Sequence, residues 1–218
     1  MVSNIQNDGF SEFRIRTLKT VLFILLCLPA LSLGYAAFSN SFADPIKELT
    51  LTTGEWALRI LLMTLAITPL RRLTGWGKLA RLRRMLGLFS FFYMISHFLI
   101  YLVLDRYLYW PDIIVDFTER PYIIAGLTCL LACAPLAITS TDGMIRRLGG
   151  RMWKRLHKLV YLAAIAAVLH FLWLVKSDLT EPLIYGTILF FLFFDRIRTN
   201  NIWPSFSGKL FRTTAAPN

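Results

Sequence analysis

Long apolar runs alternate with short polar segments along this chain. A helix rises about 1.5 Å per residue, so about 20 apolar residues cross a hydrocarbon layer about 30 Å thick. Six runs approach this length, and we expect transmembrane helices near residues 18–38, 54–70, 86–104, 121–140, 156–175 and 181–195. The sequence therefore predicts an all-α integral membrane protein with six transmembrane helices, built as a single domain over residues 1–218.

The overall composition agrees with a membrane protein. Of the 218 residues, 56% are hydrophobic, and the mean hydropathy is +0.56, whereas soluble domains are about 45–50% apolar. The predicted spans use most of the length, and no glycine-rich phosphate loop is present, so we expect no nucleotide-binding module. The run from Val21 to Leu33 has features of a signal peptide, but it continues to Phe38, and we expect an uncleaved first span.

The net charge of +11 comes from basic residues on one side of the predicted membrane. With the N-terminus inside, the inner segments hold 19 of the 24 Lys and Arg residues. The five others are Lys47, Arg59, Arg106, Arg120 and Lys176. This asymmetry follows the positive-inside rule and predicts that both termini are cytoplasmic. The basic residues then face anionic lipid headgroups, which argues against nucleic acid as the partner.

All three histidines fall within or beside the apolar runs, at His97, His157 and His170. A buried imidazole needs a polar partner or a metal, and ionisable residues inside membrane segments are functional candidates. His157 and His170 are thirteen residues apart, which is about 20 Å of helical rise, so one helix offers a ligand near each membrane face. A transmembrane haem protein is favoured. A proton or metal transporter and purely structural contacts are the alternatives.

The depths of the histidines suggest which of them form a pair. His97 and His170 both fall in the outer half of their predicted helices, and can supply the two axial ligands of one haem. His157 lies at the inner edge without a histidine opposite. On a straight helix His157 and His170 would point about 140° apart, so they cannot both face one flat interface. Segment 105–120 is expected to be an outer aromatic loop and a possible docking face for a partner.

Four stretches of the chain resemble the MsrQ family, also called YedZ, and through it the wider ferric-reductase-like transmembrane group. They are RRMLGLFSFFYMISHFLIY at 83–101, RPYIIAGL at 120–127, ITSTDGMIRRLG at 138–149 and WKRLHKLVYL at 153–162. The likeness extends over nearly the whole chain, and its most specific part surrounds His157. It implies a six-helix b-type cytochrome in the bacterial inner membrane.

The resemblance also implies an electron path. Electrons would enter on the cytoplasmic side, from the quinol pool or a flavin reductase, and leave to the periplasmic molybdopterin subunit MsrP. That partner reduces methionine sulfoxide in oxidised envelope proteins, so no catalytic residue for that step is expected in this chain. The family is also associated with FMN. A stand-alone ferric or quinone-linked reductase is the alternative enzyme, and a proton-coupled transporter is the alternative of another class.

This chain departs from the wider group at the inner site. The group carries two histidines on each of two helices, whereas here Arg83, followed by Arg84, stands fourteen residues before His97. The inner site therefore has three possible forms: no cofactor, a second haem on His157 with an unusual partner such as Arg83, or a flavin. Arginine stays protonated and suits a propionate or phosphate instead. The candidates for that role are Arg83, Arg84, Arg151 and Arg155.

Overall fold

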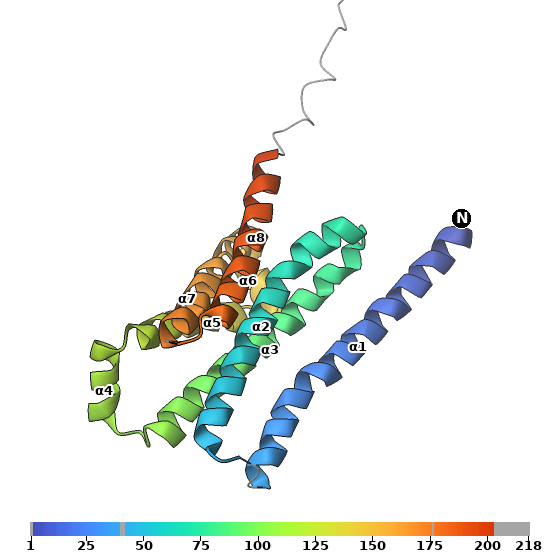
Figure 1. Cartoon of the computed structure of the whole chain (residues 1–218). Coiled ribbons are helices and arrows are strands. Elements are labelled where there is room, and N and C mark those ends of the chain that lie inside the picture. Colours follow the sequence, from blue (N-terminus) through green and yellow to red (C-terminus); the bar gives the residue numbers. More distant parts are fainter. Residues whose placement is uncertain (1, 40–41, 176, 203–218) are drawn as a thin grey trace, which may run out of the picture.

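The computed structural model describes residues 2–39, 42–175 and 177–202, and the regular elements in this part of the chain are all helices (Figure 1). Eight α-helices are joined by short turns, with a 3-10 segment before α3 and a π-helical segment after it. The elements are α1 (Val2–Phe38), α2 (Pro45–Thr74), η1 (Gly77–Arg81), α3 (Leu82–Leu99), η2 (Ile100–Asp105), α4 (Trp110–Glu119), α5 (Pro121–Ile138), α6 (Asp142–Leu156), α7 (Leu159–Leu174) and α8 (Thr180–Ile202).

The all-α prediction is confirmed, and each of the six predicted ranges coincides with a helix for most of its length. By length and apolar composition, three stretches of the described chain could cross a membrane, namely Glu12–Phe38, Gly77–Asp105 and Pro121–Ile138. The bent pair α6 and α7 would make a fourth. Helix α7 alone has 16 residues, and such a helix is only about 24 Å long. Six spans and the orientation of the termini stay predictions.

Two helical segments lie where the sequence predicted loops. Segment 105–120 is predicted to be a loop, and this prediction is wrong for Trp110–Glu119, which form the amphipathic helix α4. Helix α2 begins at Pro45 rather than near residue 54, because Asp44 caps it by accepting a hydrogen bond from the Lys47 amide at 3.2 Å and proline suits the first helical turn. The polar first turn of α2 and the short, amphipathic sequence of α4 hide these helical residues from an analysis based on long apolar runs.

The expectation that one helix carries both His157 and His170 is also wrong. Thr141 caps α6, Gly149 interrupts it with a left-handed φ of 71°, and His157 is the residue at its C-terminal end. Helix α7 starts at Leu159 and is bent from α6 by 45°. The angle of about 140° expected between His157 and His170 on one straight helix therefore does not apply, because the two residues lie on either side of this break.

The helices pack as two main pairs, α2 with α3 and α5 with α7, around a core of leucine, isoleucine and alanine side chains. We name the two ends of the bundle after the short helices that they carry, the α4 end and the α6 end. Ion pairs tie the segments together at the α6 end. They join Glu12 to Arg81 at 2.7 Å, Arg84 to Asp142, and Arg72 to Asp195.

Helix α1 is attached to the bundle at its internal proline. Near Pro29, the buried Tyr93 hydroxyl of α3 donates to the Leu26 carbonyl at 2.7 Å and accepts from the Ala30 amide at 3.1 Å. The hydroxyl thus stands between a donor and an acceptor that would bond each other in an uninterrupted helix. Tyr93 lies one helical turn before His97, so the same face of α3 serves the contact with α1 and the candidate site.

We expect Tyr93→Phe to lower the stability of the bundle by about 1–3 kcal/mol, because it leaves a buried carbonyl and a buried amide without their partner. The measurement is the midpoint of denaturant unfolding in detergent. Tyr35→Phe is the matched control, since Tyr35 on α1 is 74% exposed and its loss should change little. An equal shift in both variants would contradict the role of the Tyr93 hydroxyl.

Candidate functional site

His97 on α3 is held by the backbone of α2. Its Nδ1 lies 2.8 Å from the Thr50 carbonyl oxygen. A carbonyl only accepts, so Nδ1 must carry the proton, and in a neutral ring Nε2 is left with a free lone pair. A second-shell bond of this kind fixes the tautomer and the ring orientation of metal-binding histidines. His97 is therefore arranged as a ligand through Nε2.

His170 on α7 repeats the same arrangement on the other helix pair. Its Nδ1 lies 2.6 Å from the carbonyl oxygen of Tyr122 in the first turn of α5. The Tyr122 ring also packs against the imidazole, with centroids 6.0 Å apart. As for His97, the backbone acceptor places the proton on Nδ1 and leaves Nε2 unprotonated.

A glycine makes each of these close approaches possible. A Cβ at Gly54 would lie 3.1 Å from Nδ1 of His97, and one at Gly126 would lie 2.8 Å from Nδ1 of His170. Each glycine follows the accepting carbonyl by four residues, where a side chain would cover that carbonyl on the helix surface. The two histidine contacts therefore depend on small residues at positions 54 and 126.

The two imidazoles face each other at a separation that suits one shared metal ion. Their ring centroids are 6.0 Å apart, and their planes are nearly perpendicular, at 87°. A metal–nitrogen bond to imidazole is about 2 Å long, so two rings on opposite sides of one ion have centroids about 6 Å apart. The predicted pairing of His97 with His170 in space is thus found in the structure.

Both histidines line a cavity of about 280 Å³ between α2, α3, α5 and α7. Its walls are mainly apolar, with Leu58, Met94 and Leu130 among the lining residues. Toward the α4 end the lining becomes polar and includes Arg106 and Arg120. Two neighbouring imidazoles with unprotonated Nε2 atoms, apolar walls and two arginines in the lining fit a haem, which is a flat apolar group with an iron that binds nitrogen ligands and with two carboxylates.

His157 lies elsewhere, at the end of α6. Its ring stacks on Trp153 at 3.9 Å, and its Nδ1 lies 3.1 Å from the Trp153 carbonyl. Trp153 is fixed in turn by its indole nitrogen, which donates to the Thr139 carbonyl at 2.9 Å. His157 is half-buried. Its Nδ1 faces a carbonyl, so Nε2 again carries the free lone pair.

Among the described residues, no hydrogen bond or ion pair is found between His157 and any of the four predicted arginines, and their role there stays a prediction. Within the described residues, Arg83 donates to the Thr68 hydroxyl at 2.9 Å, and Arg84 pairs with Asp142. Arg151 and Arg155 are exposed on α6. Arg83 stands out because its buried Nε has no hydrogen-bond partner in the part of the chain that the structure describes.

Sequence reasoning missed several residues of the site, namely Gly54, Gly126, Arg106, Arg120 and Asp116. The two glycines carried a weak signal, since glycine in an apolar helix often marks a close approach. The burial of Asp116, which is 4% exposed, had no sequence signal because its neighbours form the unpredicted helix α4.

The fold and the site together define a class: a helical membrane protein with two histidines from different helix pairs brought together in one internal cavity. The model of the ferric reductase like transmembrane component matches residues 53–168, a range that contains His97 and His157 and ends two residues before His170. The chain belongs to this family and, within it, to the MsrQ family of heme-binding subunits.

Curated relatives support that assignment over most of the chain. Three proteins named "Protein-methionine-sulfoxide reductase heme-binding subunit MsrQ" illustrate it. The protein of Herminiimonas arsenicoxydans is 45% identical over 183 residues, which cover 83% of this chain and 84% of that protein. The protein of Xanthomonas campestris pv. campestris (strain B100) is 52% identical over 173 residues, or 79% and 76%. That of Azospira oryzae is 44% identical over 198 residues, or 88% and 85%. No solved structure gives a significant match.

Proposed function

We propose that this chain is a b-type cytochrome membrane subunit that passes electrons across the bacterial inner membrane to a periplasmic methionine sulfoxide reductase. The observation that carries the proposal is the pair His97 and His170, with ring centroids 6.0 Å apart and each Nδ1 on a backbone carbonyl, which leaves each Nε2 with a free lone pair. The names of the relatives, heme-binding subunits of that reductase, supply the cofactor and the system.

A haem held by His97 and His170 would supply one-electron transfer without binding a substrate, because both axial positions are filled. The residues of the chain do the rest. The Thr50 and Tyr122 carbonyls hold the two rings in the ligating tautomer, and the apolar walls limit the access of water. Reduction of methionine sulfoxide belongs to the partner, a molybdopterin subunit of the MsrP type.

The proposed topology has six spans in one domain over residues 1–218, with both termini in the cytoplasm. The α6 end then faces the cytoplasm and the α4 end the periplasm. The clustering of basic residues in the segments of the α6 end supports this orientation. The polar part of the cavity lining, with Arg106 and Arg120, belongs to the α4 end, the side on which electrons are proposed to leave to the partner.

Electron entry is proposed at the α6 end, where His157 and Arg83 lie. The donor is the quinol pool or a cytoplasmic flavin reductase, and the inner cofactor is a second haem or FMN. The buried Nε of Arg83, without a partner in the described residues, supports an anionic group there. Arg84, Arg151 and Arg155 are proposed as contributors to phosphate or propionate binding at this face.

The first test is a spectrum of the detergent-purified protein, reduced minus oxidised, with haem quantified per chain as the pyridine haemochrome. We expect a low-spin b-type spectrum and at least one haem per chain. A value near one would fit the His97–His170 site alone, and a value near two would add His157. A folded protein that takes up no haem when supplied with it would overturn the proposal and favour a transporter.

A further inference from the structure

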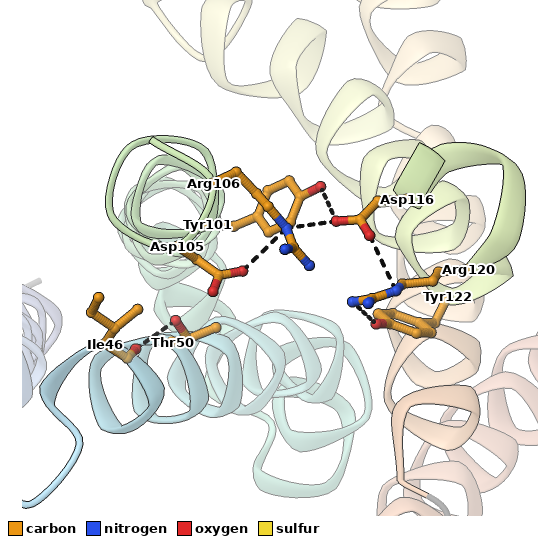
Figure 2. Close-up of polar contacts among 8 residues, drawn as sticks. All are labelled: Ile46, Thr50, Tyr101, Asp105, Arg106, Asp116, Arg120 and Tyr122. Atoms are coloured by element: carbon orange, nitrogen blue, oxygen red, sulfur yellow. Dashed lines mark hydrogen bonds and ion pairs between the residues drawn. The ribbon is translucent and has the colours of Figure 1, made fainter. Parts of the chain in front are cut away.

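A buried carboxylate organises two arginines at the α4 end of the bundle (Figure 2). Asp116 on α4 is 4% exposed. Its Oδ2 lies 2.7 Å from Nε of Arg106 and accepts from the Tyr101 hydroxyl at 3.0 Å, while its Oδ1 lies 3.1 Å from Nε of Arg120. The Asp116 carboxylate therefore contacts the Nε atoms of two arginines that lie at different places in the chain.

The contacts found among the described residues use few of the donors of the two guanidinium groups. The Nε of Arg106 makes no well-aligned hydrogen bond despite its short distance to Asp116, and the guanidinium lies over the Tyr101 ring, 5.9 Å from its centroid. Arg120 uses one Nη to donate to the Tyr122 hydroxyl at 3.3 Å, and this bond raises the pKa of Arg120. A guanidinium has five N–H donors, so most of them are free to bind an anion.

These two arginines lie beside the anchors of both histidines. Arg106 and Arg120 line the same cavity as His97 and His170. In Figure 2 their guanidinium groups point toward the space between Thr50 and Tyr122, the residues whose carbonyls hold the two imidazoles. An anion bound by the arginines would therefore sit at the edge of a flat group ligated by the histidines.

The two guanidinium groups have one buried and one more exposed carboxylate beside them. Both contact the buried Asp116, whereas Asp105, which lies 3.5 Å from Nε of Arg106, is 46% exposed. Partly buried arginines bind carboxylates strongly through paired, charge-assisted hydrogen bonds. Resting on the haem site of the proposed function, we propose that Arg106 and Arg120 bind the two propionate carboxylates of the haem, with Asp116 as the residue that positions them.

The test compares two forms of one ligand. Apo-protein in detergent is titrated with haemin and with haemin dimethyl ester, in which both carboxylates are blocked. The proteins are the wild type, Arg106→Gln, Arg120→Gln and the double variant. Lys47→Gln is the matched control, because Lys47 is a basic residue at the same end that does not line the cavity. Affinity is followed by the low-spin spectrum that the two histidines impose.

We expect the wild type and Lys47→Gln to bind haemin about 100-fold more tightly than its dimethyl ester, about 10-fold for each arginine. Each single variant should lose about 10-fold of this preference, and the double variant should bind both forms alike, with an unchanged low-spin spectrum and a lower reduction potential. Equal binding of the two forms by the wild type would overturn the proposal even if the variants fail to fold. Failure of the wild type to bind either form would overturn the haem function itself.

Discussion

His170→Ala is expected to abolish the low-spin haem of the cavity, and His97→Ala is expected to do the same. Each substitution removes one of two imidazoles whose ring centroids are 6.0 Å apart and whose Nε2 atoms carry the free lone pairs. Loss of a supporting group around a metal lowers affinity about 10–100-fold, and loss of the ligand itself costs more, so we expect the haem affinity to fall at least about 100-fold. Haem per chain and the low-spin spectrum of each purified variant are the measurements.

His157→Ala is the matched control for both variants. His157 is stacked on Trp153 at the end of α6 and does not line the cavity. Its loss should leave the low-spin signal of the cavity haem and remove only the cofactor of the second site. Gel filtration confirms that the variants are folded. Full wild-type haem content in both His97→Ala and His170→Ala would show that the cavity is not the haem site.

The pairing of His97 with His170 could be predicted from sequence because helical rise converts position along a membrane segment into depth. The apolar runs located the helices for the same reason, since a membrane segment must be both long and helical. The ligand role of the two residues stays a prediction, but the geometry that it requires is present in the structure.

Other features could not be predicted because they depend on contacts between distant segments. The predicted run 156–175 starts at a break, because α6 ends at His157 and α7 begins at Leu159 with a bend of 45° between them, and apolar composition does not report such a bend. Asp116 looked like a solvated loop residue, but α4 turns it toward Arg106 and Arg120. The orphan Nε of Arg83 is likewise visible only when α2 and α3 are packed together.

The two histidines are supported by the same arrangement, a backbone carbonyl and a glycine four residues after it. Thr50 and Gly54 serve His97, and Tyr122 and Gly126 serve His170, with sequence separations of 47 and 48 residues between carbonyl and ring. In each case a glycine uncovers a helix carbonyl one turn earlier, and the carbonyl then fixes the imidazole. The sequence shows no repeat of residues here, so only the geometry reveals that the two ligands are held in the same way.

We therefore expect Gly126→Ala to weaken haem binding about 10–100-fold, as loss of a supporting contact does. The new Cβ would lie 2.8 Å from Nδ1 and 3.0 Å from Cε1 of His170, so the ring must move and lose its bond to the Tyr122 carbonyl. Haem titration of the apo-protein measures the effect. Gly54→Ala, with contacts of 3.1 Å to His97, should give a smaller loss.

Gly186→Ala on α8 is the control for helix propensity, because its Cβ would meet only a methyl group of Val168 at 3.8 Å. Alanine favours a helix over glycine by up to about 1 kcal/mol, so this variant should keep its haem affinity and gain stability. A double-mutant cycle then isolates the contact between Gly126 and His170. In the His170→Ala background the ring is gone, and Gly126→Ala should no longer destabilise the apo-protein in denaturant. If Gly126→Ala is equally destabilising with and without the His170 ring, steric displacement of that ring is not the cause.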